Sequence, residues 1–251
     1  MNQWGTLVIR AGEEEAGHGI GSKTFFHIGP IAVSEAIFSA WIVMAVLVIL
    51  SILATRNMQR IPTGLQNVFE LIIETWMGII DRTAGPPGRG FAPLVITAFL
   101  FILTANWLGT MPPFGDMKGF KSPNSDLNVT AAMAIIVFVA TQVYALKTLG
   151  IGGFVKELFI PNPLHIITEL SRPVSLALRL FGNIFAGGTL VHTMLALAPF
   201  VTFAFLGLEL FVGAVQALIF AMLTLVFLSI ATSHGHGDHN GHAEEHGAGH
   251  H

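Results

Sequence analysis

The chain has 251 residues, of which 53% are hydrophobic and only 11% are charged, and its formal net charge at pH 7 is −3. A soluble domain usually carries about 25% charged residues, so this composition indicates a protein that resides in a lipid bilayer. The lack of cysteine excludes disulfides and cysteine-based metal or redox sites, and the small net charge gives no reason to expect a nucleic-acid partner.

The chain begins with a polar stretch, and we predict an N-terminal arm over residues 1–35. This arm contains three consecutive acidic residues, 13–15, and no apolar core of the kind found in a cleavable signal peptide.

Five apolar stretches between residues 36 and 232 are almost free of charge, and each is long enough for a membrane helix, which needs about 20 residues. The stretches are continuous and do not alternate with polar residues, which favours helices over a β-barrel. We therefore predict an all-α membrane domain with helices near residues 36–55, 91–111, 128–148, 164–198 and 200–232.

The loops between these helices differ in charge. Four arginines lie between the first and second helices, and Lys147 and Lys156 lie at the end of the third helix and in the loop after it, whereas the second loop is nearly balanced. Because positive loops stay in the cytoplasm, the N-terminus is predicted outside and the C-terminus inside the cell.

The first of these loops includes a segment, 64–80, with apolar residues at helical spacing and polar residues on the other face. This pattern predicts an amphipathic helix that either lies at the membrane interface or packs on the bundle. The proline- and glycine-rich stretch 86–90 that follows predicts a loop.

The last two predicted helices exceed 30 residues, which corresponds to roughly 50 Å at about 1.5 Å per residue. Since the hydrocarbon core is about 30 Å thick, we expect both helices to tilt strongly and to form a hairpin. Residues 233–251 follow as a tail rich in glycine and histidine that cannot build a core, and we predict it to be disordered.

The fourth helix contains Arg179 within an otherwise apolar run. An arginine stays protonated, and at a helix centre in the bilayer it costs about 2.5–3.5 kcal/mol on insertion scales. Its helical neighbours are small or polar: Ser175, Gly182, Asn183 and Ala186. This stripe indicates a closely approaching partner, although snorkelling or an ion pair with Glu209 stays open as an alternative.

The last helix carries a matching polar stripe of Glu209, Gly213 and Gln216. A carboxyl group in a membrane helix is a candidate for proton relay, which gives Glu209 a functional interpretation. For Gln216 alone a helix–helix hydrogen bond is the simpler interpretation, and His192 is either a relay or a structural hydrogen bonder.

Two segments together resemble a known family. The segment RPVSLALRLFGNIFAGG (172–188), followed by VQALIFAMLTLVFLS (215–229), is similar to subunit a of the F-type ATP synthases, and NWLGTMPPF (106–114) resembles the end of that family's second helix. The resemblance covers the chain from the first helix to about residue 232.

The resemblance implies a proton-conducting stator subunit in a bacterial inner membrane, with no catalytic chemistry or cofactor of its own. Its implied partners are a rotating ring of carboxylate-bearing c subunits, peripheral-stalk b subunits, and the rest of the F1Fo complex. Arg179 would face the ring and prevent a proton short-circuit between two offset half-channels. The remaining implied residues are Asn183 and Gln216 near the arginine, Asn106 and Glu209 on the outer path, and Ser175, Glu169 and, more weakly, His165 on the inner path.

The sequence departs from the family pattern at Gly188, where many members carry Glu or His, and His192 one turn later is a candidate substitute. Two other functions stay open: a metal-ion transporter, suggested by the histidine-rich tail, and a purely structural scaffold. The membrane helices lack the His/Asp cluster that a divalent ion requires, so no metal ligands are predicted.

Overall fold

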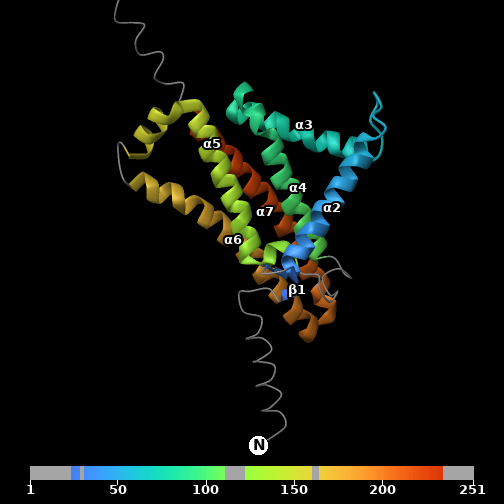
Figure 1. Cartoon of the computed structure of the whole chain (residues 1–251). Helices are drawn as coiled ribbons and strands as arrows, with labels where there is room; N and C mark the ends of the chain where they lie inside the picture. Colours follow the sequence, from blue (N-terminus) through green and yellow to red (C-terminus); the bar gives the residue numbers. More distant parts are fainter. Residues whose placement is uncertain (1–23, 29–30, 111–121, 160–163, 234–251) are drawn as a thin grey trace, which may run out of the picture. The chain divides into compact units, whose positions relative to one another are not determined.

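The structure is a computed structural model that describes residues 24–28, 31–110, 122–159 and 164–233 (Figure 1). The predicted tail 234–251 and most of the predicted N-terminal arm lie outside the described residues. The elements follow the order β1 (Thr24–Ile28), β2 (Ile31–Ser34), α2 (Glu35–Thr55), α3 (Leu65–Ala84), η1 (Pro86–Phe91), α4 (Ala92–Thr110), η3 (Pro123–Ser125), α5 (Leu127–Phe159), α6 (Leu164–Leu197) and α7 (Pro199–Ser233).

Five helical segments within the described residues are long and apolar enough to cross a membrane, as the sequence predicts. They are Glu35–Thr55, Pro86–Thr110, Leu127–Thr148, Ser171–Leu195 and Phe200–Ala231. The chain is therefore a helical, multi-pass membrane protein.

The chain divides into two compact units, and the helices pass from one to the other. Unit 1 comprises Met1–Val48, Phe101–Ala131 and Ala177–Ala214, and unit 2 comprises Ile49–Leu100, Ala132–Leu176 and Val215–His251.

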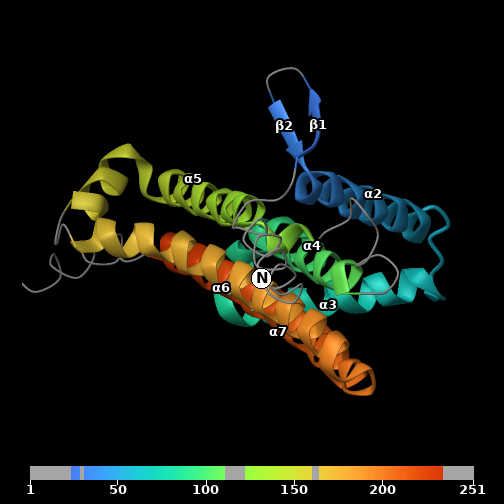
Figure 2. The same cartoon turned by 90° about the horizontal axis from the view of Figure 1, so that it is seen from below.

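Unit 1 contains a short element that the sequence did not predict. Strands β1 and β2 pair antiparallel, with Ile28 opposite Ile31, and β2 leads directly into α2 (Figure 2). In the same unit only Ala198 separates α6 from α7, so these two helices form the predicted hairpin.

The core of unit 2 includes one face of α3, the helix predicted from the amphipathic segment. Trp76 and Ile80 of α3 are buried against Phe91 and Val95 beside α7 residues that include Leu225. The rings of Trp76 and Phe99 lie 5.2 Å apart between centroids. The C-terminal half of α3 therefore packs on the bundle through its apolar face, and the apolar residues of its first turn stay exposed.

The segment 86–90 is not an open loop, in contrast to the prediction from its prolines and glycines. It forms the 3₁₀ helix η1 with Pro in its first turn, after Gly85 turns the chain with φ 65°. Arg89 donates two hydrogen bonds to the carboxylate of Asp81 at 2.9 and 3.0 Å, and the Tyr144 hydroxyl donates to the carbonyl of Gly90 at 3.0 Å. These side-chain contacts stabilise a conformation that local composition alone does not indicate.

The last helices have the predicted length, with 34 residues in α6 and 35 in α7. Pro173 lies within α6 without ending it, and Gly150, with φ 70°, bends α5 near its C-terminal end. The tilt of α6 and α7 to the membrane stays a prediction.

Candidate functional site

Arg179 lies near the middle of the span Ser171–Leu195, and its side chain is exposed on the surface of the subunit. Within the described part of the chain it forms no hydrogen bond or ion pair, so the alternative of a structural pair with Glu209 is wrong. The predicted stripe around it, Ser175, Gly182, Asn183 and Ala186, is exposed along its whole length. A permanent cation among small exposed residues inside an apolar span suits a partner that supplies a negative charge.

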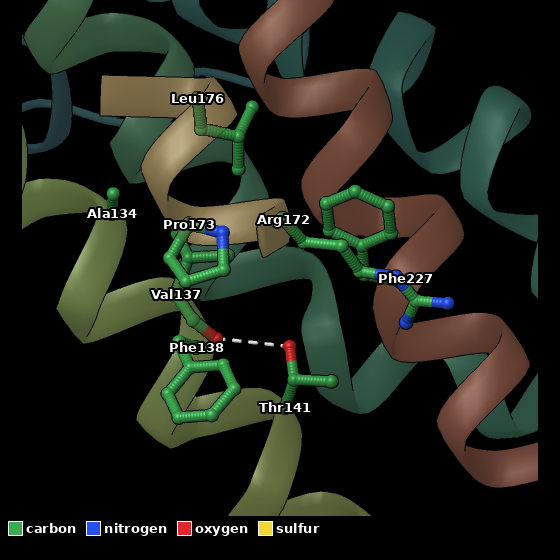
Figure 3. A pocket seen from close by; sticks show the side chains of 8 residues that line it. All are labelled: Ala134, Val137, Phe138, Thr141, Arg172, Pro173, Leu176 and Phe227. Atoms are coloured by element: carbon green, nitrogen blue, oxygen red, sulfur yellow. Dashed lines mark hydrogen bonds between the residues drawn. The ribbon is translucent and has the colours of Figure 1, made fainter. Parts of the chain in front are cut away.

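The other arginine of α6 behaves differently. The guanidinium of Arg172 lies over the ring of Phe227 in α7, 5.0 Å from the ring centroid (Figure 3). A small pocket beside it is lined mainly by apolar side chains, including Pro173 and Leu176, and the Thr141 hydroxyl at its edge donates to the Val137 carbonyl at 2.9 Å. Arg172 is therefore held within unit 2 by an aromatic partner, which distinguishes it from Arg179.

A buried polar cluster connects α4, η3 and α7 in unit 1. Asn106 of α4 donates through Nδ2 to the carbonyl of Gly213 at 3.0 Å, and Asn124 of η3 donates through Nδ2 to Oδ1 of Asn106 at 2.7 Å. Both asparagines are essentially inaccessible, with 2% and 0% of their surface exposed. The next residue of α4, Trp107, donates through its indole nitrogen to the carbonyl of Leu210 at 3.2 Å.

The polar turn that carries Asn124 is anchored on both sides. Ser122 packs against Gly109, where any larger residue would collide with it, and its hydroxyl donates to the Ala105 carbonyl at 3.3 Å. Asp126 caps the start of α5, since its Oδ1 accepts from the backbone nitrogen of Asn128 at 2.9 Å. Asn124 is thus held from both ends of a short segment.

Glu209 of α7 is half-buried and lies against α6 in the same unit. Its Oε1 atom is 3.2 Å from the position that a Cβ atom would occupy at Gly187. Among the described residues, no neighbouring atom lies within 4 Å of the corresponding position at Gly188. The carboxyl group therefore occupies a notch that exists because residue 187 is glycine.

The remaining predicted residues are distributed over both units. Gln216 of α7 is 2% exposed in unit 2, and the exposed Ser175 belongs to the same unit. The side chains of Glu169, His165 and His192 lie outside the described part of the structure. The structure thus brings Asn106 to α7 and Glu209 to α6.

Sequence reasoning missed Asn124, Gly187 and the two α7 carbonyls that accept hydrogen bonds from α4. Asn124 belongs to the stretch SPNSD, which reads as an ordinary polar turn. Among the described residues no group of three or more His, Cys, Asp or Glu side chains lies close enough to hold a metal ion.

A comparison with known proteins identifies the family. The family model for the ATP synthase A chain matches residues 37–229, which include every predicted site residue. The chain belongs to the ATP synthase A chain family. The matched range contains nearly all of the five spans, together with the exposed stripe of Arg179 and the buried cluster of Asn106.

Curated relatives of this family agree over most of the chain. The chain is 36% identical to ATP synthase subunit a of Moorella thermoacetica over 216 residues, which cover 84% of this chain and 96% of that protein. It is 34% identical to ATP synthase subunit a 2 of a Bradyrhizobium species over 84% of this chain and 94% of that protein. It is also 37% identical to ATP synthase subunit a 1 of Hahella chejuensis, over 84% of this chain and 89% of that protein.

Proposed function

We propose that this chain is the proton-conducting stator subunit of a rotary F-type ATP synthase, in which Arg179 faces a rotating ring of carboxylate-bearing c subunits. The observation that supports this is the exposed, unpaired guanidinium within a membrane span of the described chain. Its placement costs about 2.5–3.5 kcal/mol unless a partner compensates, and an ionised carboxylate on the ring supplies that compensation.

In this proposal the arginine separates two proton half-channels that are offset along the ring. A proton arrives from outside past Asn106 and Glu209 and neutralises a ring carboxylate. The neutral carboxyl group then travels through lipid as the ring turns, and it releases its proton to the inner side past Ser175 and Glu169. The deprotonated carboxylate pairs with Arg179 before the next cycle, and the fixed cation repels any proton that would cross directly.

The energy for rotation comes from the transmembrane potential. Each proton that crosses supplies about 2.3 kcal/mol per 100 mV, so several protons must combine for each ATP. The chain carries out no ATP chemistry itself in this proposal and works with peripheral-stalk b subunits and the rest of F1Fo. We place it in the bacterial inner membrane with the N-terminus outside and the C-terminus in the cytoplasm, from the charges of its loops.

The test is ATP-driven proton pumping in inverted membrane vesicles that contain the complete complex. Arg179→Ala should abolish pumping while the amount of assembled complex stays unchanged, because only the charge that faces the ring is lost. Arg82→Ala, which removes an exposed arginine of α3, is the matched control and should pump like the unaltered complex. A complex with Arg179→Ala that still pumps at the normal rate would support a structural scaffold instead.

A further inference from the structure

The amide of Asn106 has a defined orientation, which the Gly213 carbonyl requires and a second amide supports. The Asn106 side chain crosses from α4 to α7, where Nδ2 reaches the Gly213 carbonyl at 3.0 Å. Its other end, Oδ1, accepts a hydrogen bond from Nδ2 of Asn124 at 2.7 Å. Because the Gly213 carbonyl can only accept, Asn106 must present nitrogen to α7 and oxygen to η3, and the NH2 group of Asn124 supplies the donor that this oxygen needs.

The contact at α7 depends on a close approach. The position of a Cβ atom at Gly213 would lie 3.0 Å from Cβ of Asn106, so this glycine lets the side chain reach the helix backbone. Gly213 follows Glu209 by one helical turn, and Trp107 donates to the Leu210 carbonyl between them. The two donors of α4 therefore hold the turn of α7 that carries the carboxyl group of the proposed outer path.

We propose that Asn124 is a positioning residue for the outer proton path. Its NH2 group donates to the Asn106 oxygen and so supports the one orientation in which α4 stays hydrogen-bonded to α7 at Gly213, and this keeps Glu209 in its notch beside Gly187. The inference rests on the proposed proton-conducting function, because it assigns Asn124 a role only where Glu209 carries protons.

The buried environment makes the direction of this hydrogen bond decisive. Asn124 is fully buried, and its Oδ1 atom has no hydrogen-bond partner among the described residues. If residue 124 could only accept, the Asn106 amide would have to turn over, and its oxygen would then face the Gly213 carbonyl. A buried polar group that loses its partner is costly, so the turned amide would release α7 from α4.

The experiment compares variants that separate donor chemistry from size. Asn124→Asp keeps the shape of the side chain but presents only acceptors when ionised, whereas Asn124→Ser is smaller and keeps a hydroxyl donor. Passive proton conductance is measured in vesicles of the complete complex after removal of F1, with a potassium diffusion potential as the driving force. The amount of this chain in the assembled complex is measured in the same membranes.

We expect conductance per assembled complex to fall about tenfold with Asn124→Asp, which is the order of magnitude for the loss of one buried hydrogen bond. Asn124→Ser should retain most of the conductance because its hydroxyl still donates. Asn128→Asp, the same change at an exposed position four residues later, should leave conductance unchanged.

The opposite order would overturn the proposal. If Asn124 only fills space, the isosteric aspartate should conduct normally and the smaller serine should not. If the complex with Asn124→Asp does not assemble, the serine variant still tests the proposal. A large loss of conductance in that variant would contradict a donor role of Asn124. Conductance absent from the unaltered complex would refute the proposed function itself, whereas normal conductance in both variants would refute only the role of Asn124.

Discussion

The carboxyl group of Glu209 in α7 lies against Gly187 in α6, with Oε1 3.2 Å and Cδ 3.3 Å from the place where a Cβ atom at residue 187 would stand. At the adjacent Gly188, no neighbouring atom of the described residues lies within 4 Å of the equivalent position. Two neighbouring glycines therefore differ in their environment, and this difference allows a matched test of the proposed outer proton path.

Gly187→Ala should reduce passive proton conductance about threefold. The added methyl group forces the carboxyl group to move by a few tenths of an ångström. A displacement of about 1 Å of a reacting group can lower a reaction rate roughly 100-fold, so this smaller shift should have a smaller effect. Gly188→Ala should have no effect, because nothing in the described part of the chain lies within 4 Å of the added atom. Passive proton conductance is measured in vesicles stripped of F1. Equal losses of conductance in both variants would show that conductance does not depend on the notch at residue 187.

Glu209→Gln should slow proton uptake from the outer side by about 100-fold. The amide keeps the size of the side chain but cannot accept and release a proton, and a positioned proton-transfer group typically contributes at least this factor. ATP synthesis driven by an imposed proton gradient is the measurement, and Glu74→Gln on the exposed face of α3 is the control. An unchanged rate of synthesis would remove Glu209 from the proton path.

Trp76→Ala should lower the free energy of unfolding by about 3–5 kcal/mol, because it empties the centre of the unit 2 core where Trp76 packs on Phe99. Ile73→Ala removes an exposed side chain from the same helix and should change that free energy by no more than about 0.5 kcal/mol. Chemical unfolding of the detergent-solubilised chain, followed by circular dichroism, distinguishes the two. Similar losses in both variants would mean that α3 is not held by its buried face.

The contact between Asp81 and Arg89 predicts a pH dependence of stability. The hydrogen bond from Arg89 holds the pKa of Asp81 below its ordinary value. Because this pKa is lowered in the folded chain, ionised Asp81 contributes to the free energy of unfolding above the ordinary aspartate pKa of about 3.9. That contribution is lost as the pH falls through the lowered pKa. Asp81→Asn should therefore lower Tm slightly at pH 7, and the difference should disappear in acid. Both side chains are exposed, so the effect is small, and a difference that grows on acidification would contradict this assignment.

The membrane architecture follows from local sequence. A run of about 20 apolar residues is long enough to span the hydrocarbon core, and in a lipid-exposed helix each backbone polar group must bond within that helix. For this reason the five spans, the unusual length of α6 and α7, and the polar stripe around Arg179 could all be predicted from residue spacing. The family, in contrast, was expected from the resemblance of the segments 172–188 and 215–229 to known sequences.

Local sequence did not predict the structure correctly or fully where side chains from other segments contribute to the conformation. Residues 86–90 have the composition of a loop, yet they form η1, and Asp81 and Tyr144 from other elements bond to it. The amphipathic pattern of α3 left open whether the helix lies on the membrane or on the bundle, and the burial of Trp76 and Ile80 shows that its second half packs on the bundle.

The sequence by itself determined which segments are long and apolar enough to cross the membrane and where charged residues lie in them, since both depend on contiguous residues. Only the tertiary structure decided that Asn124 orients Asn106 and that Gly187 accommodates Glu209. Asn106 and Gly213 are 107 residues apart in the chain, and their contact depends on the register at which two helices meet. That register is determined by the packing of the whole helix pair, and neither polar turn residues nor isolated glycines reveal it in advance.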